Sequence, residues 1–214
     1  MGVVIGLGRG SGGMTHRQNR VLPTGDIVAI PDRGLFMGNR GILHDAEGRL
    51  GVARWKHPHW ITCRLEFKGR KRNLMAPGSY TELFFLDEAV ACAAGHRPCA
   101  ECRRAEWLLF REAWVGLYGE MPAAAIDRSL HRARVERRAQ RRHVAPVAEV
   151  PPGAMILLDG RAHLMREGAV QPFSPAGYGP LRDVPSGAVT VLTPEPMVAV
   201  MRAGWRPALH PSAL

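Results

Sequence analysis

Apolar and polar residues alternate along residues 59–68, "HWITCRLEFK". The apolar positions fall on one face of an extended chain, at Ile61, Cys63, Leu65 and Phe67. This period of two predicts a half-buried β-strand. Shorter apolar pieces between glycine-containing turns predict further strands near 26–30, 34–37 and 41–43. The segment "YTELFFL" (80–86) is a buried strand or the approach to the next helix.

Helical patterns follow in the middle of the chain. Asp87 is a suitable N-cap for a helix over "EAVACAAG" that ends at Gly95. Residues 99–119 predict a second helix with a broad apolar face that includes Trp107, Phe110 and Trp114. A third helix is expected from about Pro122 to His143. It contains "RSLHRARVERRAQRR", which carries seven arginines and one glutamate.

The pattern changes after the proline-rich segment "APVAEVPPG". Residues 154–173 predict two strands around an Asp-Gly turn, and "AVTVLTP" predicts another strand. A short helix is expected to be capped by Thr193 and to stop at Gly204. The predicted fold class is therefore α+β, with short strands and two or three helices followed by a small β-rich C-terminal part. We expect a flexible leader (1–22), a mixed part (23–148) and a β-rich part (149–214), although one continuous core is equally possible.

The charge balance bears on partners. The 214 residues include 29 Lys and Arg against 19 Asp and Glu, a formal net charge of +10. Such an excess favours a polyanionic partner, and we expect nucleic acid, DNA rather than RNA. No segment reaches the roughly 18 consecutive apolar residues of a transmembrane helix, so no membrane partner is expected. With four cysteines and no export signal, we expect a reducing cytoplasm and free thiols.

Cys99 and Cys102 form a Cys-x-x-Cys pair, which is typical of redox sites and of metal sites. A redox pair begins a helix after the first strand of a βαβ unit, whereas here a helix precedes the pair. A zinc knuckle among these strands and helices is therefore favoured, and it needs further ligands. The alternative is that Cys99 and Cys102 pack as small apolar groups without a metal. His59 and Cys63 are candidates only if residues 60–62 form a turn, because an extended strand would separate them by about 13 Å. The substitutes for His59 are His57 and His44.

The segment "DEAVACAAGHRPCAEC" resembles the end of the zinc-binding domain of the Ada DNA-repair family, over about residues 57–104. The resemblance implies Zn²⁺ held by Cys63, Cys99, Cys102 and His59, and a DNA-binding role in repair or damage sensing. In that family a zinc-bound cysteine accepts a methyl group from a DNA phosphotriester. The matching position here is His59, so the resemblance does not imply methyl transfer.

Basic side chains near these segments are candidates for nucleic-acid contacts, because arginine forks suit phosphates. They come from the Cys-x-x-Cys turn, from "FKGRKR" and from the arginine-rich helix: Arg97, Arg103, Arg104, Lys68, Arg70, Lys71, Arg72, Arg134, Arg138 and Arg141. One continuous track would give strongly salt-dependent binding. The alternative is a solvated helix face.

A second hypothesis is an enzyme acting on nucleic acid or nucleotides: a hydrolase, glycosylase or lyase. Asp127 and His131 stand one helical turn apart, as a base and its orienting acid would. Such a spacing is also common in plain surface contacts on helices. Further catalytic candidates are Asn39, Arg40 and Glu82. A third hypothesis is a zinc-stabilised interaction module without a nucleic-acid partner.

Overall fold

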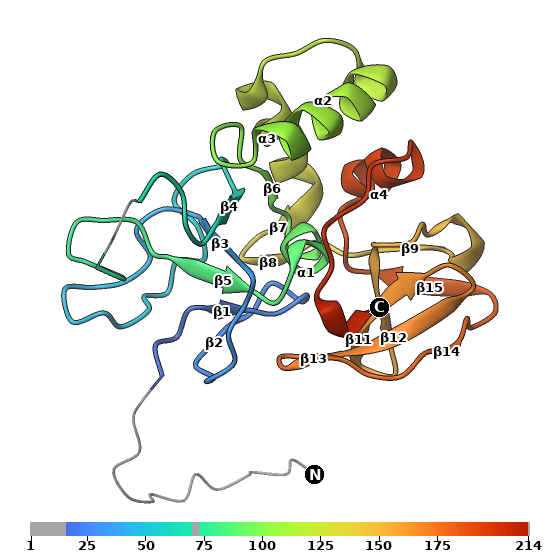
Figure 1. Cartoon of the computed structure of the whole chain (residues 1–214), viewed down its shortest axis with the longest axis horizontal. Helices are drawn as coiled ribbons and strands as arrows, with labels where there is room; N and C mark the ends of the chain where they lie inside the picture. The colour runs from blue at the N-terminus through green and yellow to red at the C-terminus, as the bar shows by residue number, and fades with distance from the viewer. Residues whose placement is uncertain (1–15, 70–72, 214) are drawn as a thin grey trace, which may run out of the picture.

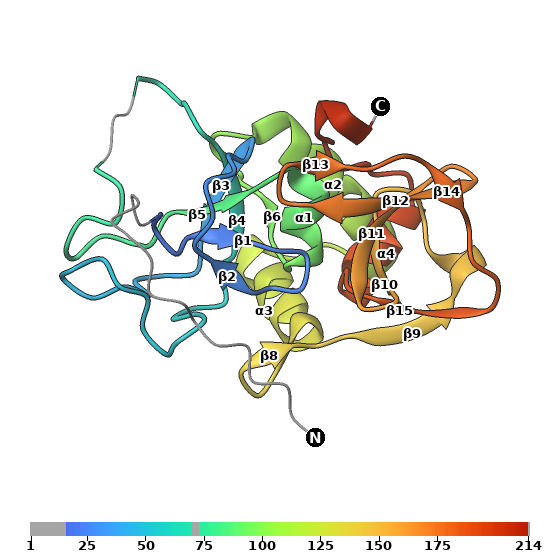
Figure 2. The same cartoon turned by 90° about the horizontal axis from the view of Figure 1, so that it is seen from below.

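The computed structural model describes residues 16–69 and 73–213. In this part of the chain, strands and helices both occur throughout, which confirms the α+β class. Figure 1 shows two sheets side by side, with helix α1 (Glu88–Ala93) between them. The view from below in Figure 2 shows the same arrangement. Helix α1 contacts strands of both sheets, so it links the two halves of the fold.

The first sheet contains six strands in the order β2-β1-β5-β3-β4-β6. Strand β4 pairs with β3 in antiparallel and with β6 in parallel orientation, so it lies between them. The strand predicted by the period-two pattern is confirmed as β4, although it ends at Arg64. The bounds are β1 (Arg20–Val21), β2 (Ile27–Val28), β3 (Phe36–Asn39), β4 (Ile61–Arg64), β5 (Leu83–Phe85) and β6 (Arg97–Pro98).

Two expectations for this region are corrected. Strand β1 lies inside the predicted leader, so the leader prediction is wrong for residues 20–21, while residues 1–15 lie outside the described part. No strand forms at 41–43; the pairing that follows is a single bridge between His44 and Leu50. Gly41 has a φ of 102°, and this turn conformation interrupts an extended run.

The second sheet follows the order β13-β12-β11-β10-β15-β9, with β14 beside β12. The predicted Asp-Gly hairpin is confirmed: Asp159 and Gly160 both have positive φ and join β10 to β11. Such a two-residue turn matches the twist of the strands that it connects. The bounds are β9 (His143–Pro146), β10 (Met155–Leu158), β11 (Arg161–Arg166), β12 (Ala169–Ser174), β13 (Gly177–Tyr178), β14 (Arg182–Asp183) and β15 (Ala188–Val191).

Helix α1 begins as predicted, because the Asp87 carboxylate accepts a hydrogen bond from the Val90 amide at 2.9 Å. Residues 208–210 run beside this helix start. The Ala208 amide donates to Glu88 and the His210 amide donates to Asp87, at 2.9 and 3.0 Å. The remaining helices are α2 (Arg104–Tyr118), α3 (Ala123–Arg134), α4 (Glu195–Arg202) and the short η1 (Val147–Glu149) and η2 (Pro211–Ala213).

The third predicted helix is too long by nine residues at its end. Helix α3 stops at Arg134, and a hairpin of β7 (Val135–Glu136) and β8 (Ala139–Gln140) follows. The Gln140 amide group donates to three carbonyl oxygens from distant segments, those of Pro23, Ala93 and Leu192. A continued helix would lose these bonds and would stack arginines of like charge at helical spacing.

The predicted Thr193 cap is also wrong. The Thr193 hydroxyl accepts a hydrogen bond from the Met155 amide at 2.9 Å, and Pro194 occupies the cap position of α4.

Two apolar clusters form the core. One gathers α2, α3 and α4 against the second sheet around Trp107, Phe110, Trp114, Ile126, Leu130, Ile156 and Met197. The other joins β5 and α1 to Met155, Leu164 and Leu192. Both clusters contain residues from either side of position 149, so the packing is continuous across that position.

Candidate metal centre and its pocket

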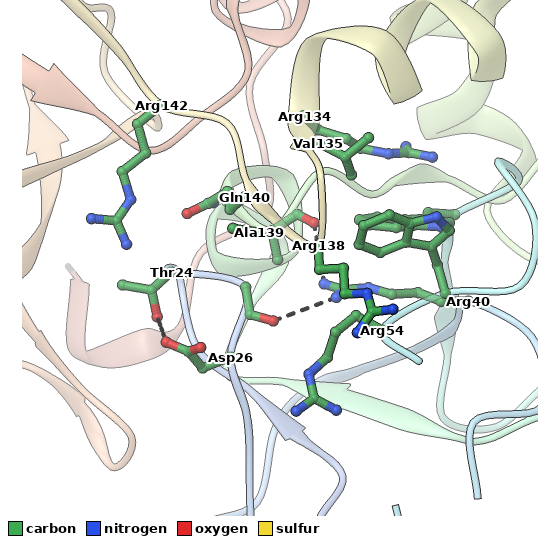
Figure 3. Close-up of a pocket in the computed structure, with 14 residues that line it drawn as sticks. Thr24, Asp26, Arg40, Arg54, Arg134, Val135, Arg138, Ala139, Gln140 and Arg142 are labelled. Atoms are coloured by element: carbon green, nitrogen blue, oxygen red, sulfur yellow. Dashed lines mark hydrogen bonds between the residues drawn. The ribbon is translucent and has the colours of Figure 1, made fainter. Parts of the chain in front are cut away.

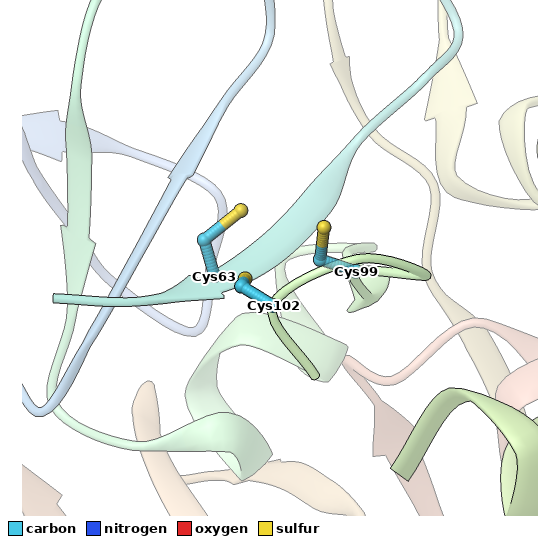
Figure 4. Close-up of side chains that lie close together, drawn as sticks. All are labelled: Cys63, Cys99 and Cys102. Atoms are coloured by element: carbon cyan, nitrogen blue, oxygen red, sulfur yellow. The ribbon is translucent and has the colours of Figure 1, made fainter. Parts of the chain in front are cut away.

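Three thiol groups meet at one corner of the first sheet. The sulfurs of Cys63, Cys99 and Cys102 all lie within 4.8 Å of one another (Figure 4). Cys63 is supplied by β4, and the other two by the turn that follows β6. The parallel pairing of Thr62 with Pro98 places the two elements side by side, and the Cys99 amide extends it by donating to the Thr62 carbonyl at 3.0 Å.

Backbone amides surround these sulfurs. The Glu101 amide lies 3.4 Å from the Cys99 sulfur and donates to it, and the Cys102 amide donates to the same sulfur. The Arg64 amide donates to the Cys102 sulfur. Such donors stabilise thiolates, which are the form that binds metals.

The three thiols have different pKa values. A hydrogen bond from the Cys63 thiol lowers the pKa of Cys99 to about 5, and amide donors add to this effect. The same contact raises the pKa of Cys63, and burial raises the pKa of Cys102. The lowered pKa of Cys99 favours its thiolate form, which accepts hydrogen bonds from the other two thiols. This donor set could hold a metal ion in place of the shared protons.

The structure does not bring His59 to this cluster, which corrects the predicted ligand set. The His59 side chain is half exposed, and its Nδ1 lies 2.8 Å from the Asp127 carboxylate. Residues 61 and 62 belong to strand β4, so residues 60–62 do not form the turn that pairing His59 with Cys63 at one metal would require. Neither substitute is nearer: His57 packs on His59, and His44 bonds to the Thr81 hydroxyl. Among the described residues, no fourth Cys, His, Asp or Glu completes the group.

A cavity of about 460 Å³ opens beside the sulfurs, and all three cysteines line it. Two of the predicted catalytic residues, Asn39 and Glu82, line it as well. Glu82 is buried, and its Oε2 accepts a hydrogen bond from the Met75 amide at 2.7 Å. The thiol cluster is thus one wall of a pocket that also presents a carboxylate and an amide side chain.

Three arginines predicted to contact nucleic acid are buried in the protein. Arg97 donates to both carboxylate oxygens of Asp127, at 2.7 and 2.8 Å. Arg103 makes a two-point ion pair with Glu88 beneath α1. Arg134 is 1% exposed and donates to backbone carbonyls. The expectation that these three arginines project from the surface is therefore corrected, because each is buried and bound to internal partners.

The other predicted basic residues divide into two groups. Arg104, Lys68, Arg138 and Arg141 are exposed. Arg70, Lys71 and Arg72 lie outside the described residues.

The predicted pairing of Asp127 with His131 does not form. The Asp127 carboxylate is occupied by Arg97 and His59, whereas the His131 ring packs edge-on against Trp55 and Trp60, with centroids 5.7 Å away in each case. The two residues are one turn apart on α3, but their side chains bind different neighbours.

Arg40, the remaining catalytic candidate, is 2% exposed. Its Nε donates to Nε2 of His96 at 3.0 Å. His96 is itself fully buried, and the sequence analysis did not identify it as the partner of Arg40. Its position in the Gly-His-Arg turn between α1 and the cysteines is the sequence feature that could have pointed to it.

No helix within the described residues is both long and apolar enough to cross a membrane. All four cysteines are free. No protein-family model matches the chain, and neither the curated proteins nor the solved structures include a significant match.

Proposed function

We propose that the protein is a zinc-dependent enzyme acting on nucleic acid or nucleotides, with Cys63, Cys99 and Cys102 as zinc ligands. The observation that supports this best is that three sulfurs within 4.8 Å of one another all line one cavity. Structural zinc sites are closed by four protein ligands, whereas catalytic sites keep three and leave one position open.

Zinc is favoured among metals by the donor set. Thiolates are soft ligands that select zinc, copper(I) or iron–sulfur clusters. Three ligands on a rigid strand pair and turn leave the fourth tetrahedral position for a small molecule. Four unpaired cysteines also suit a reducing compartment, and we propose the cytoplasm.

Bound zinc would supply Lewis acidity towards a substrate oxygen. Of the glutamates that line this pocket, Glu82 is the best acid–base candidate, because its carboxylate is buried and is fixed by the Met75 amide. Asn39 lines the same cavity from β3, and its side chain offers both a donor and an acceptor for orienting a substrate.

Nucleic acid or a nucleotide is the substrate class that the charge favours. The net charge is +10, and Arg104, Arg138 and Arg141 remain at the surface. A polyanion would be attracted to such a protein over a distance set by the salt concentration.

A second candidate is a zinc-stabilised DNA-binding protein of repair or damage sensing. One observation favours it: the Ada-like segment folds as a capped helix, a turn and a pair of neighbouring cysteine sulfurs. In this case the metal would have a structural role, and the cavity would hold part of the bound strand.

Metal analysis of the purified full chain tests the zinc centre. We expect about one zinc per chain, and cobalt in its place should give the charge-transfer absorption of cobalt–thiolate bonds. Cys63→Ser and Cys99→Ser should each lose the zinc and the cobalt–thiolate absorption. Cys92→Ala should retain the two, because Cys92 lies in the apolar cluster around Trp107 and Phe110. Wild-type protein without metal, or Cys63→Ser with full occupancy and unchanged absorption, would remove the proposal.

Turnover separates the two candidates. The zinc-loaded protein is incubated with single- and double-stranded DNA, RNA and nucleoside phosphates, and the products are separated. Glu82→Gln should retain zinc and lose turnover, whereas Glu112→Gln, at an exposed position of α2, should retain both. Salt-dependent DNA binding without turnover supports the second candidate, and absence of both binding and turnover contradicts both.

A further inference from the structure

A second cavity, of about 260 Å³, lies beside the hairpin that follows α3. It shares no lining residue with the cysteine pocket. Five arginines line it, and Asp26 is the one carboxylate among the lining residues. The arginines come from three segments of the chain, at 40, 54 and 134–142, and surround the space in Figure 3: Arg40, Arg54, Arg134, Arg138 and Arg142.

Two of these arginines are buried. Arg40 donates to the Gly25 and Ala94 carbonyls and to His96, and Arg134 donates to the Gly95 and Pro58 carbonyls. No described carboxylate lies within ion-pair distance of either guanidinium, and Nε of Arg134 has no described hydrogen-bond partner. Carbonyl dipoles solvate these cations but do not neutralise them.

Both buried guanidinium groups also stack on Trp60, at 4.1 Å for Arg40 and 3.9 Å for Arg134 from the ring centroid. Because both guanidinium groups contact the same Trp60 ring, their two positive charges lie close together. Burial, and the charge of nearby Arg54, lower the pKa of Arg40 to about 9. Burial and the charge of Arg40 likewise lower the pKa of Arg134. Concentrated positive charge of this kind is costly unless an anion compensates it.

The one acidic lining residue does not supply that compensation. Asp26 is exposed, and its carboxylate accepts a hydrogen bond from the Thr24 hydroxyl at 2.7 Å. It raises the pKa of Arg40 less than burial and Arg54 lower it. The cavity therefore retains an excess of positive charge.

We propose that this cavity binds a phosphate group, with Arg54, Arg138 and Arg142 contacting it in front of the buried Arg40 and Arg134. Guanidinium groups recognise phosphate oxygens by paired hydrogen bonds and keep their charge at neutral pH. Trp55 is half-buried, lines the same cavity and offers a surface on which a base can stack. The ligand class is thus a phosphate that belongs to a nucleotide or to a nucleic-acid backbone. This site goes beyond the proposed zinc chemistry and does not depend on it.

The test uses the full chain and titration calorimetry, together with tryptophan fluorescence, because Trp55 and Trp60 both line the cavity. The probes are inorganic phosphate, a nucleoside 5′-monophosphate and a single-stranded oligonucleotide. Wild-type protein should bind at least one phosphate probe. The double variant Arg138→Gln, Arg142→Gln should lose affinity at least tenfold, and it should fold, because both side chains are exposed. Arg182→Gln, at an exposed position of β14 outside the cavity, should bind within twofold of wild type.

The outcomes separate the sources of the phosphate. Tighter binding of the mononucleotide than of the oligonucleotide assigns the site to a free nucleotide, and the reverse order assigns it to a nucleic-acid backbone. Failure of all three probes to bind wild-type protein overturns the proposal. Equal affinities for wild type and the double variant also overturn it. Repeating the titration with Cys63→Ser keeps this result apart from the zinc proposal, because phosphate binding should survive loss of the metal.

Discussion

The buried ion pair between Arg97 and Asp127 should make a large contribution to stability. The side chains are 6% and 2% exposed, and two hydrogen bonds of 2.7 and 2.8 Å join them. The pair ties β6 to α3, directly before the turn that carries Cys99. Asp127→Asn removes the negative charge and one acceptor, and it leaves the Arg97 guanidinium with one neutral side-chain oxygen at position 127, the Pro98 carbonyl and the face of Trp107.

Breaking a buried pair by removing one partner costs about 3–5 kcal/mol, because the other charge remains buried and uncompensated. The half-exposed His59 that also bonds to Asp127 adds little to this figure, because solvent screens it. For a chain of this length, such a loss lowers the melting temperature by about 6–20 °C. We expect the urea midpoint of Asp127→Asn to fall accordingly, with an unchanged m-value.

The matched control is Glu120→Gln, which removes a carboxylate from the exposed ion pair with Arg111. Its effect should stay below about 1 kcal/mol. Adding Arg97→Met to Asp127→Asn should restore part of the stability, since an apolar residue needs no counter-charge. A loss below about 1 kcal/mol for Asp127→Asn, or no recovery in the double variant, would refute the reasoning.

Two further predictions concern stability. Burial lowers the pKa of His96 well below its usual value, so only the unfolded chain gains this proton as the pH falls below about 6.5. The urea midpoint should fall as the pH drops below about 6.5, and the fall should be smaller in His96→Gln. The same dependence of the midpoint on pH in both proteins would contradict this. In Gly34→Ala the new Cβ would lie 1.9 Å from the Phe85 carbonyl oxygen, so we expect a loss of about 2 kcal/mol or more. Gly116→Ala, in open space on α2, should instead gain about 0.5–1 kcal/mol; thermal unfolding of both variants checks the contrast, and a stable Gly34→Ala would contradict it.

Elements with a strong local signal were predictable from the sequence. The alternation around Cys63, the Asp87 cap and the Asp159-Gly160 turn depend on residues close together in the chain, and all three are present. Cys63 was named as a ligand through the resemblance to the Ada family, and it does lie beside the later cysteine pair. The turn over residues 60–62 that was expected to bring His59 along with it does not form, because residues 61 and 62 belong to strand β4.

Which arginines are buried and which are exposed could not be predicted, because burial depends on tertiary partners. Arg97 and Asp127 are 30 residues apart, and Arg103 and Glu88 are 15 apart. A charge count treats these residues as surface. The end of α3 was missed for the same reason, since the hairpin after it is held by the bonds of Gln140 to three distant segments.

The start of α1 has a consequence for how the protein is made. Its Asp87 and Glu88 carboxylates receive backbone donors that lie 123 and 120 residues further along the chain. During translation, both carboxylates therefore lack these backbone donors until residues 208–210 have emerged from the ribosome. Glu88 also pairs with Arg103, next to Cys102, so this late contact lies close to the thiol corner. A metal ion that binds the three cysteines before residues 208–210 are made would bind beside a helix α1 whose contacts are still incomplete.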